Sequence, residues 1–502
     1  MSKTAMIITI GARDLQLKSS LPKDTLEKIN AMPVKNNPDC LCLSSARDDG
    51  KVVLENFSEF KDHLIYPIIK PGIDKVILEI PDKTDNSQQH DQILNSSIDN
   101  EPEISNQIDT IILVSTDQDD PVKENFKRND TLHVADCIKK LIDRDYSRQK
   151  EKVKHLRITK NVTNYDSMYD FFDDKFSGNF FRDLEPDETS LYILPQGGID
   201  AVNHTLLLKA IEKYPKTFQL CKPEQSSVAY LQQFPAKFRK NIVKHKIVHA
   251  LENYNYASIP DFEYSSTVSA LSEYALSLIC LDYENAKTVL QNLLDEDCEN
   301  RETFLKLIEN IDVLHKNYDL RLKEVYITAK IKLKQKLHSD FLIKIFTLGE
   351  NFLKPKIEEY LDGGFEYNEG NKHKKWNALL LKHPDLLEHL KTCKIDNNPL
   401  KFNSPNRIAY QEIYNFFTKN QDDEVIGRLK KLFRIIMELS NLRNKTAHDI
   451  IGVTEHKINE RLKSINSSLD EFIKQADEYF EINKENPYGR FDEINEIIKN
   501  FL

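Results

Sequence analysis

Arg443, Asn444 and His448 form a group of residues that could carry out acid–base chemistry on RNA. A histidine with a pKa near neutrality can move a proton to or from a ribose oxygen. A guanidinium can bind a phosphate and offset the negative charge that builds up on it. Together these groups could cleave RNA through attack by the substrate's own 2′-hydroxyl, a reaction that needs no metal.

The spacing of this group is weakly specific, since Arg128–His133 and Arg239–His245 are similar pairs. Arg443 and His448 differ from them because they end an amphipathic helix expected over 423–449. Five apolar residues form the expected buried stripe of this helix: Leu429, Leu432, Phe433, Ile436 and Leu439.

Asn444 and His448 share one face of that helix, whereas Arg443 and His448 lie about 140° apart around it. Either the helix is locally distorted, or a second copy of the chain completes the site. The alternative is a helix-capping arginine and a surface histidine without a catalytic role.

A glycine turn, Gln196-Gly197-Gly198, follows an apolar run and precedes a helical segment that contains Asp200 and Asn203. Glycines at such a turn let backbone N–H groups approach a phosphate at the start of the helix. In a parallel sheet this turn lies at the carboxyl edge, where ligands bind. An ordinary strand-to-helix turn is the alternative, and the GxGxxG fingerprint of dinucleotide binding is absent.

Polar residues also follow two other apolar runs. Gly11, Arg13 and Asp14 follow the first, and Thr116 and Gln118 end the second. These residues should lie beside the glycine turn if the three strands are neighbours in one sheet.

A basic segment, Lys372–Trp376, contains the only tryptophan and could stack on single-stranded RNA. A solvated loop face is the alternative. No HExxH, GK[ST] or GxSxG motif stands out. Seven cysteines without a CxxC pair indicate reduced thiols, so we expect no metal site.

Residues 1–230 alternate between strand-like and helix-like patterns, which predicts a parallel, doubly wound sheet. Helices are expected over Thr131–Ile142 and Ile199–Tyr214, and the polar stretch Pro81–Glu103 is expected to be a loop or a disordered insertion. Apolar runs predict strands at Ala5–Ile10, Asp74–Ile80, Asp109–Ser115, His155–Asn161 and Ser190–Gly198.

Helical periodicity dominates from residue 231 onward, with a possible kink at Pro355 and a last helical stretch near Glu455–Glu478. The 502 residues suggest three domains, at 1–230, 231–335 and 336–502. The net charge of −10 argues against broad duplex binding but allows a local basic groove. Without a long apolar run or a signal peptide, we expect a cytoplasmic protein with no membrane span.

The order of these motifs resembles the Csm/Csx-type CARF–HEPN ribonucleases of type III CRISPR systems. The segments that carry the resemblance include IITIGARD near Gly11, TDQ at Thr116–Gln118, RNDTL at Arg128–Leu132, the QGG turn, and Arg443–His448. The resemblance implies a Rossmann-like α/β CARF domain, an all-α connector and an all-α HEPN domain. One departure is the turn itself, which is Gln-Gly-Gly-Ile-Asp here and often Thr-Gly-Gly-Thr-Pro in the family.

The resemblance further implies a homodimer that binds a cyclic oligoadenylate and then cleaves single-stranded RNA in antiviral defence. Arg443 would contact the scissile phosphate, His448 would transfer protons, and Asn444 would orient His448 or the substrate. Two other functions stay open: a ligand-sensing regulator without catalysis, and a ring nuclease whose CARF domain degrades the cyclic oligoadenylate. The residues expected to bind that ligand are Gly11, Arg13, Asp14, Thr116, Gln118, Gln196, Gly197, Gly198, Asp200 and Asn203.

Overall fold

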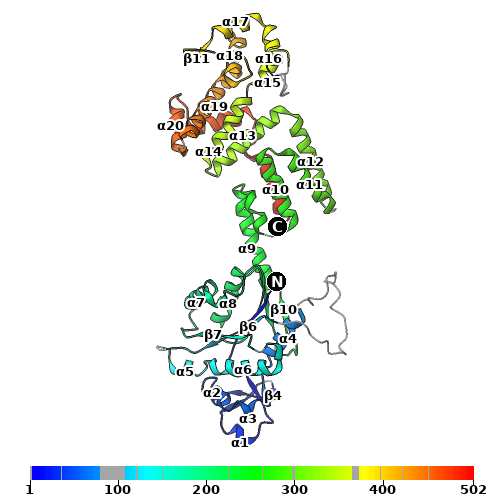
Figure 1. The fold of residues 1–502 in the computed structure, drawn as a ribbon, viewed down its shortest axis with the longest axis vertical. Coiled ribbons are helices and arrows are strands. Elements are labelled where there is room, and N and C mark those ends of the chain that lie inside the picture. Colours follow the sequence, from blue (N-terminus) through cyan, green and yellow to red (C-terminus); the bar gives the residue numbers. More distant parts are fainter. Residues whose placement is uncertain are drawn as a thin grey trace. The chain divides into compact units, whose positions relative to one another are not determined.

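The computed structural model divides the chain into two compact units, Met1–Ile242 and Val243–Leu502 (Figure 1). The polar stretch Pro81–Glu103 lies outside the residues that the structure describes. None of the helices described is both long and apolar enough to cross a bilayer. The described residues are 3–35, 37–79, 108–119, 122–149, 151–223, 225–262, 264–296, 300–363, 372–395, 397–421, 423–449 and 452–502.

A six-stranded sheet forms the centre of the first unit. Its strands lie in the order β10 (Tyr230–Gln232), β9 (Lys216–Cys221), β8 (Thr189–Leu194), β1 (Lys3–Thr9), β6 (Thr110–Thr116) and β7 (Val153–Ile158). All neighbours pair in parallel except β10 and β9. Four of the five predicted strands are thereby confirmed.

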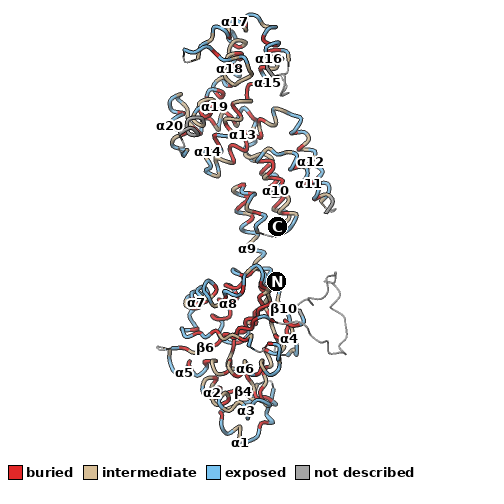
Figure 2. The backbone as a smooth tube through the Cα atoms, in the orientation of Figure 1, coloured by how far each residue is buried: buried red, intermediate tan, exposed pale blue. Residues whose placement is uncertain are grey.

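Helices cover both faces of this sheet, as the prediction of a doubly wound fold requires. In β1, Met6 and Ile8 pack with α4 (Ile69–Glu79) and α6 (Leu132–Asp145). The alternate residues Ala5 and Ile7 pack on the other face with α7 (Tyr165–Ser177) and α8 (Asp200–Lys213). The three central strands β8, β1 and β6 are accordingly buried along nearly their whole length (Figure 2).

The predicted strand at Asp74–Ile80 is wrong, because this segment belongs to the helix α4. Ile69, Ile73, Val76 and Ile77 are buried, and Leu78 is 67% exposed. This pattern has the period of a helix with one buried face. The apolar run within Asp74–Ile80 is too short to distinguish a strand from part of such a helix.

A second, antiparallel sheet of the first unit was not predicted. Its order is β3 (Ala31–Val34), β4 (Asn37–Leu43), β2 (Gln16–Lys18) and β5 (Leu64–Ile65). Leu17, Leu43 and Leu64 place it in the same hydrophobic core as α4 and α6. The short helices of this unit are α1 (Lys23–Leu26), α2 (Asp48–Glu55), α3 (Phe57–Phe60) and α5 (Glu124–Lys127).

The second unit is helical and has two hydrophobic cores. The first core contains α10 (Ser266–Cys280), α11 (Tyr283–Glu296), α12 (Arg301–Lys316) and the C-terminal α22 (Arg490–Asn500). The second contains α14 (His338–Asn351), α15 (Lys354–Tyr360), α16 (Lys372–Leu381), α17 (Pro384–Thr392), α18 (Arg407–Phe417), α19 (Glu424–Asp449), α20 (Glu455–Lys463) and α21 (Leu469–Tyr479). The helix α13 (Tyr318–Lys334) contributes to both cores. The boundary between the two units falls within α9 (Phe234–Glu252).

Three expectations for the helical region can be compared with the structure. All five residues of the predicted stripe on α19 are buried, which confirms that helix. Pro355 produces no kink, because it lies in the first turn of the separate helix α15, where its missing N–H costs nothing. The stretch near Glu455–Glu478 consists of α20 and α21, separated by a break in which Asn466 has a φ of 56°.

Candidate functional site

Three strand exits meet at the carboxyl edge of the large sheet, because β8, β1 and β6 are neighbours. Gly11 follows β1, the Gln196–Gly198 turn follows β8, and Thr116 is the last residue of β6. Ile8 pairs with both Leu194 and Leu113, so the three strands end at similar heights. The structure therefore brings together the three groups of polar residues that the sequence assigned to one edge.

The glycine turn lies directly against the end of β1. A Cβ atom on Gly197 would be 2.2 Å from Asp14 Oδ2, 2.3 Å from the carbonyl oxygen of Thr9 and 2.5 Å from the backbone nitrogen of Gly11. Gly198 has a φ of +81°, a conformation that favours glycine. The Thr9 hydroxyl donates a 2.7 Å hydrogen bond to the carbonyl oxygen of Gly197. Both glycines are thus required by the backbone geometry of the turn.

Asp14 is a buried carboxyl group behind this turn, and its Oδ2 accepts a 2.7 Å hydrogen bond from the backbone N–H of Gly11. Burial raises the pKa of Asp14 to about 7, and the hydrogen bond from Gly11 opposes this only in part. An aspartate in the unfolded chain has a pKa near 3.9. The folded protein therefore holds an additional proton between about pH 4 and pH 7.

We expect Asp14 to make the stability of the first unit depend on pH. Protonated Asp14 favours the folded state fully below about pH 4, and this contribution is lost as the pH rises through about 7, with a total of roughly 4 kcal/mol at most. Asp14→Asn keeps an acceptor oxygen and cannot ionise. The melting temperature of the wild type should therefore fall relative to that of Asp14→Asn between about pH 5 and pH 8. A constant difference across this range would contradict the assignment.

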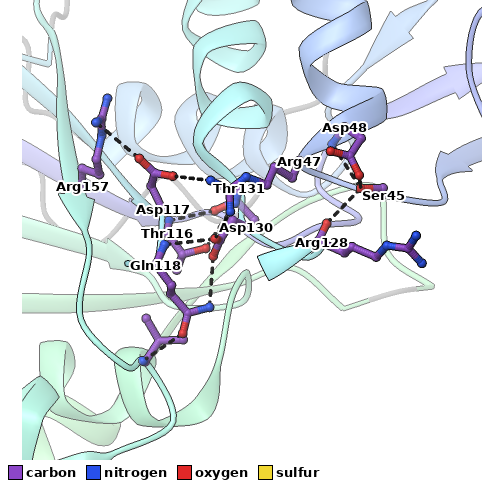
Figure 3. A network of polar contacts seen from close by, with 11 residues as sticks. Ser45, Arg47, Asp48, Thr116, Asp117, Gln118, Arg128, Asp130, Thr131 and Arg157 are labelled. Atoms are coloured by element: carbon purple, nitrogen blue, oxygen red, sulfur yellow. Dashed lines mark hydrogen bonds and ion pairs between the residues drawn. The ribbon is translucent and has the colours of Figure 1, made fainter. Parts of the chain in front are cut away.

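A polar network holds the end of β6 (Figure 3). Thr116 and Thr131 exchange two 3.1 Å hydrogen bonds, each from a backbone N–H to the other's hydroxyl. Asp130 accepts hydrogen bonds from the backbone N–H and the side-chain amide of Gln118, at 2.9 and 3.1 Å. Gln118 Oε1 in turn accepts from the N–H of Val162. The side chains of Thr116 and Gln118 are therefore engaged within the protein.

Two arginines surround the same network. Arg47 contacts Asp117 and Asp130, each at 3.3 Å, and Arg157 contacts Asp117 at 3.4 Å. Arg47 precedes α2, whose Val53 belongs to the same hydrophobic core as Leu17 and Leu43 of the antiparallel sheet. The network thus joins the end of β6 to a part of the unit that the sequence did not predict.

A cavity of about 350 Å³ opens beside this network, and Thr116, Gln118 and Ile199 are among its lining residues. The exposed residues Lys123, Phe126, Asn129, Asn161 and Thr163 also line it. They supply a cation, an aromatic ring and polar side chains around an opening. None of these five was a predicted site residue, although Asn129 belongs to the RNDTL segment, Arg128–Leu132.

The remaining predicted residues of this edge have different surroundings. The side-chain amide of Gln196 exchanges two hydrogen bonds with the backbone of Lys222, which joins the exits of β8 and β9. Arg13 and Asp200 are exposed. Asn203 is buried in α8, and its Oδ1 has no hydrogen-bond partner among the residues described. An unpaired buried acceptor of this kind calls for an explanation, and a bound ligand would provide one.

In the second unit, Arg443 lies on α19 with its guanidinium 5.0 Å from the ring centre of Phe346 on α14. The guanidinium of Arg407 lies 4.9 Å from the same ring centre. Arg407 also contacts Asn441 Oδ1 and Glu350 Oε1, each at 3.5 Å. Burial lowers the pKa of Arg407, and Glu350 opposes this shift. Two cationic groups are thus gathered around one aromatic ring.

The helices α14 and α19 approach each other closely at Gly349. A Cβ atom on Gly349 would be 3.0 Å from the hydroxyl oxygen of Ser440 and 3.1 Å from Cγ2 of Ile436. This close packing fixes Phe346 and Glu350, one turn apart on α14, against the part of α19 that carries Arg443.

The backbone of α19 is helical through Asp449, so the helix passes Asn444 and His448 without a break. The side chains of Asn444 and His448 lie outside the described residues. On a continuous helix, positions 443 and 448 lie about 140° apart around the axis. The backbone is helical between these two positions, without a break.

Trp376 does not form a stacking platform for RNA. It is fully buried on α16, and its indole N–H donates a 2.7 Å hydrogen bond to the carbonyl oxygen of Phe402. The segment is helical, so the alternative of a solvated loop is also wrong. Lys375 is exposed, and the side chains of residues 372–374 lie outside the described residues.

Comparison with known proteins gives one family match. Residues 312–499 match the family model of the Cas_Csm6 HEPN domain. Comparison with curated proteins finds no match. Among solved structures, the chain is similar to Csm6 of Enterococcus italicus bound to cyclic hexa-2'-fluoro-hexa-dAMP, with a TM-score of 0.47 and 16% identity over 79% of this chain and 92% of that one.

Proposed function

We propose that this chain, whose residues 312–499 match the Csm6 HEPN domain, is a Csm6-type CARF–HEPN ribonuclease of type III CRISPR defence, in which a cyclic oligoadenylate bound by the first unit activates cleavage of single-stranded RNA by the second unit. The observation that carries the proposal is the match of residues 312–499 to the Csm6 HEPN domain. In the first unit, the neighbouring parallel strands β8, β1 and β6 end at the sheet edge that carries the glycine turn. The protein would act in the cytoplasm as a homodimer.

The proposed cleavage uses no metal. Arg443 binds the scissile phosphate and stabilises the charge that develops on it. His448 moves the proton of the attacking 2′-hydroxyl or of the leaving 5′-oxygen, and Asn444 orients it. The product would carry a 2′,3′-cyclic phosphate, because the attacking oxygen belongs to the substrate.

The continuous helix supports a dimeric active centre. On this helix, positions 443 and 448 lie about 140° apart around the axis, which does not favour an active centre built from one copy of the helix. A second α19 related by a two-fold axis can present its histidine to the arginine of the first. In this arrangement, activation must change the position of one α19 relative to the other.

The carboxyl edge of the sheet in the first unit suits a cyclic oligoadenylate. Backbone N–H groups of the glycine turn and the start of α8 favour phosphate oxygens. Phe126, which is 54% exposed, can stack on an adenine, and Lys123 can contact a phosphate. Activation requires that the ligand bind the active arrangement of the dimer more tightly than the inactive one.

The test is cleavage of a labelled single-stranded RNA, titrated with cyclic adenylates of three to six units in the presence of EDTA. We expect one ring size to stimulate cleavage and the products to end in cyclic phosphates. A protein that binds a cyclic adenylate without cleaving RNA at any ring size would instead be a regulator without catalysis. Cleavage that EDTA abolishes would contradict the metal-free reaction.

Asn203→Ala should separate ligand binding from folding. The substitution removes an acceptor that is buried without a partner, so we expect the melting temperature to stay the same or rise. If the ligand donates a hydrogen bond to Oδ1, the concentration of cyclic oligoadenylate for half-maximal activation should increase about tenfold. An unchanged activation curve in a stable variant would exclude Asn203 from the ligand site.

A further inference from the structure

Three potential metal ligands lie together in the second unit, away from Arg443 in the sequence. His389 is in the last turn of α17, Cys393 is the residue that ends this helix, and Glu412 lies on α18. His389 Nε2 lies 3.4 Å from Cys393 Sγ and 3.9 Å from Glu412 Oε2. Cys393 Sγ lies 3.7 Å from the same carboxylate oxygen. The three atoms thus form a nearly equilateral triangle.

The triangle has the size that a tetrahedral zinc ion requires. Zinc binds sulfur at about 2.3 Å and nitrogen or oxygen at about 2.0–2.2 Å, so two ligands of one ion lie about 3.3–3.6 Å apart. The observed separations of 3.4, 3.7 and 3.9 Å differ from these values by a few tenths of an ångström at most. Small side-chain rotations would close the difference.

We propose that His389, Cys393 and Glu412 bind a zinc ion, which holds α17 against α18. The fourth position is open to water, since the side chains of His389 and Glu412 are 35% and 20% exposed. On binding, the Cys393 thiol loses its proton to solvent, and the thiolate, the imidazole nitrogen and one carboxylate oxygen become ligands.

The zinc would also fix the short hairpin that follows α17. The strands β11 (Lys394–Ile395) and β12 (Asn398–Pro399) pair directly after Cys393. The backbone N–H of Leu400 donates a 3.0 Å hydrogen bond to the carbonyl oxygen of Cys393. A metal bound to Cys393 therefore restrains both ends of this hairpin relative to α18.

The sequence did not predict this site, because Glu412 lies nineteen residues after Cys393 and no CxxC pair marks it. The alternative is a set of hydrogen bonds in which the thiol donates to the carboxylate or to the imidazole. Spectroscopy distinguishes the two, because only metal binding creates a sulfur–metal bond.

The test uses the full chain, stripped of metal and titrated with cobalt(II) and then with zinc. We expect one cobalt per chain, with the visible bands of four-coordinate cobalt and a near-ultraviolet band of a thiolate–cobalt bond, both removed by one equivalent of zinc. Wild-type protein that binds cobalt without the thiolate band, or that binds no metal, would overturn the proposal.

Two cysteine variants complete the experiment. Cys393→Ser should lower zinc affinity more than about 100-fold, since even the loss of an outer hydrogen-bond partner of a ligand costs 10–100-fold. Cys280→Ser is the matched control, because Cys280 is an exposed free cysteine of the same unit. An equal loss in both variants would contradict the site. Metal content and RNA cleavage are measured separately, so this proposal and the proposed function can fail independently.

Discussion

His448→Ala and Arg443→Ala are each expected to lower RNA cleavage by about 10²–10⁴-fold, the usual contribution of a positioned acid–base group or charge-stabilising donor. Cleavage should be measured at saturating cyclic oligoadenylate with EDTA present, so that neither activation nor a metal limits the rate. Both variants should still bind the cyclic oligoadenylate, since they leave the first unit unchanged.

Arg428→Ala provides the control for the loss of a cation from the same helix. Arg428 lies on α19 about four turns before Arg443, is exposed, and pairs with Glu424 at 3.2 Å. We expect its cleavage rate to be close to that of the wild type. If Arg428→Ala lost as much activity as Arg443→Ala, a general effect of charge on RNA binding would replace the catalytic assignment.

Mixing the two inactive variants tests whether the active centre is shared between subunits. If each centre pairs Arg443 of one subunit with His448 of the other, a mixed dimer of Arg443→Ala and His448→Ala keeps one intact centre. Random mixing should then restore about a quarter of the wild-type activity, because half of the dimers are mixed and each has one centre of two. No recovery in verified mixed dimers would contradict a centre that pairs Arg443 of one subunit with His448 of the other.

Gly197→Ala is expected to abolish activation by cyclic oligoadenylate. A methyl group at this position would lie 2.2–2.5 Å from three atoms of the β1 exit, so the turn must move away from Gly11 and Asp14. We expect the first unit to lose about 1–3 kcal/mol of stability or more, as for an overpacked core position. Differential scanning calorimetry with and without ligand should show a lower transition that the ligand no longer raises.

Gly427→Ala is the matched control for this change. Gly427 lies near the start of α19, and a Cβ atom there would meet nothing within 4 Å. Alanine favours a helix over glycine by about 1 kcal/mol, so this variant should be equally or more stable and fully activated. If Gly197→Ala behaved like Gly427→Ala, the turn would not be the rigid part of a ligand site.

The elements that could be predicted from the sequence are those with a clear local pattern of apolar residues. The strands β1, β6 and β8 are continuous apolar runs because both of their faces are buried, and such runs are visible without a structure. The order of these strands then brought Gly11, Thr116 and Gly197 to one edge. For α4, the same kind of apolar run was misread, since its helical period appears only when Ile69 and Ile73 are included.

Contacts between distant segments could not be predicted in the same way. Asp130, for example, contacts Arg47, which lies eighty-three residues before it in the chain, and Gln118, which lies twelve residues before it. In the sequence, Asp130 is a single acidic residue that indicates neither contact. Trp376 looked available in a basic segment, but the packing of α16 buries it. For the second unit, the helix and its stripe were predicted from periodicity, whereas the position of Arg443 beside Phe346 required the fold.

The close packing of α14 and α19 at Gly349 restricts how this nuclease can be regulated. With Ser440 and Ile436 in contact range of that glycine, α19 cannot slide or turn along α14 without steric overlap. In the proposed dimer, Arg443 would therefore move together with α14 and α19 as one packed unit. Signalling from the first unit would then change how the two copies of α19 meet, and not the packing of α19 within either subunit.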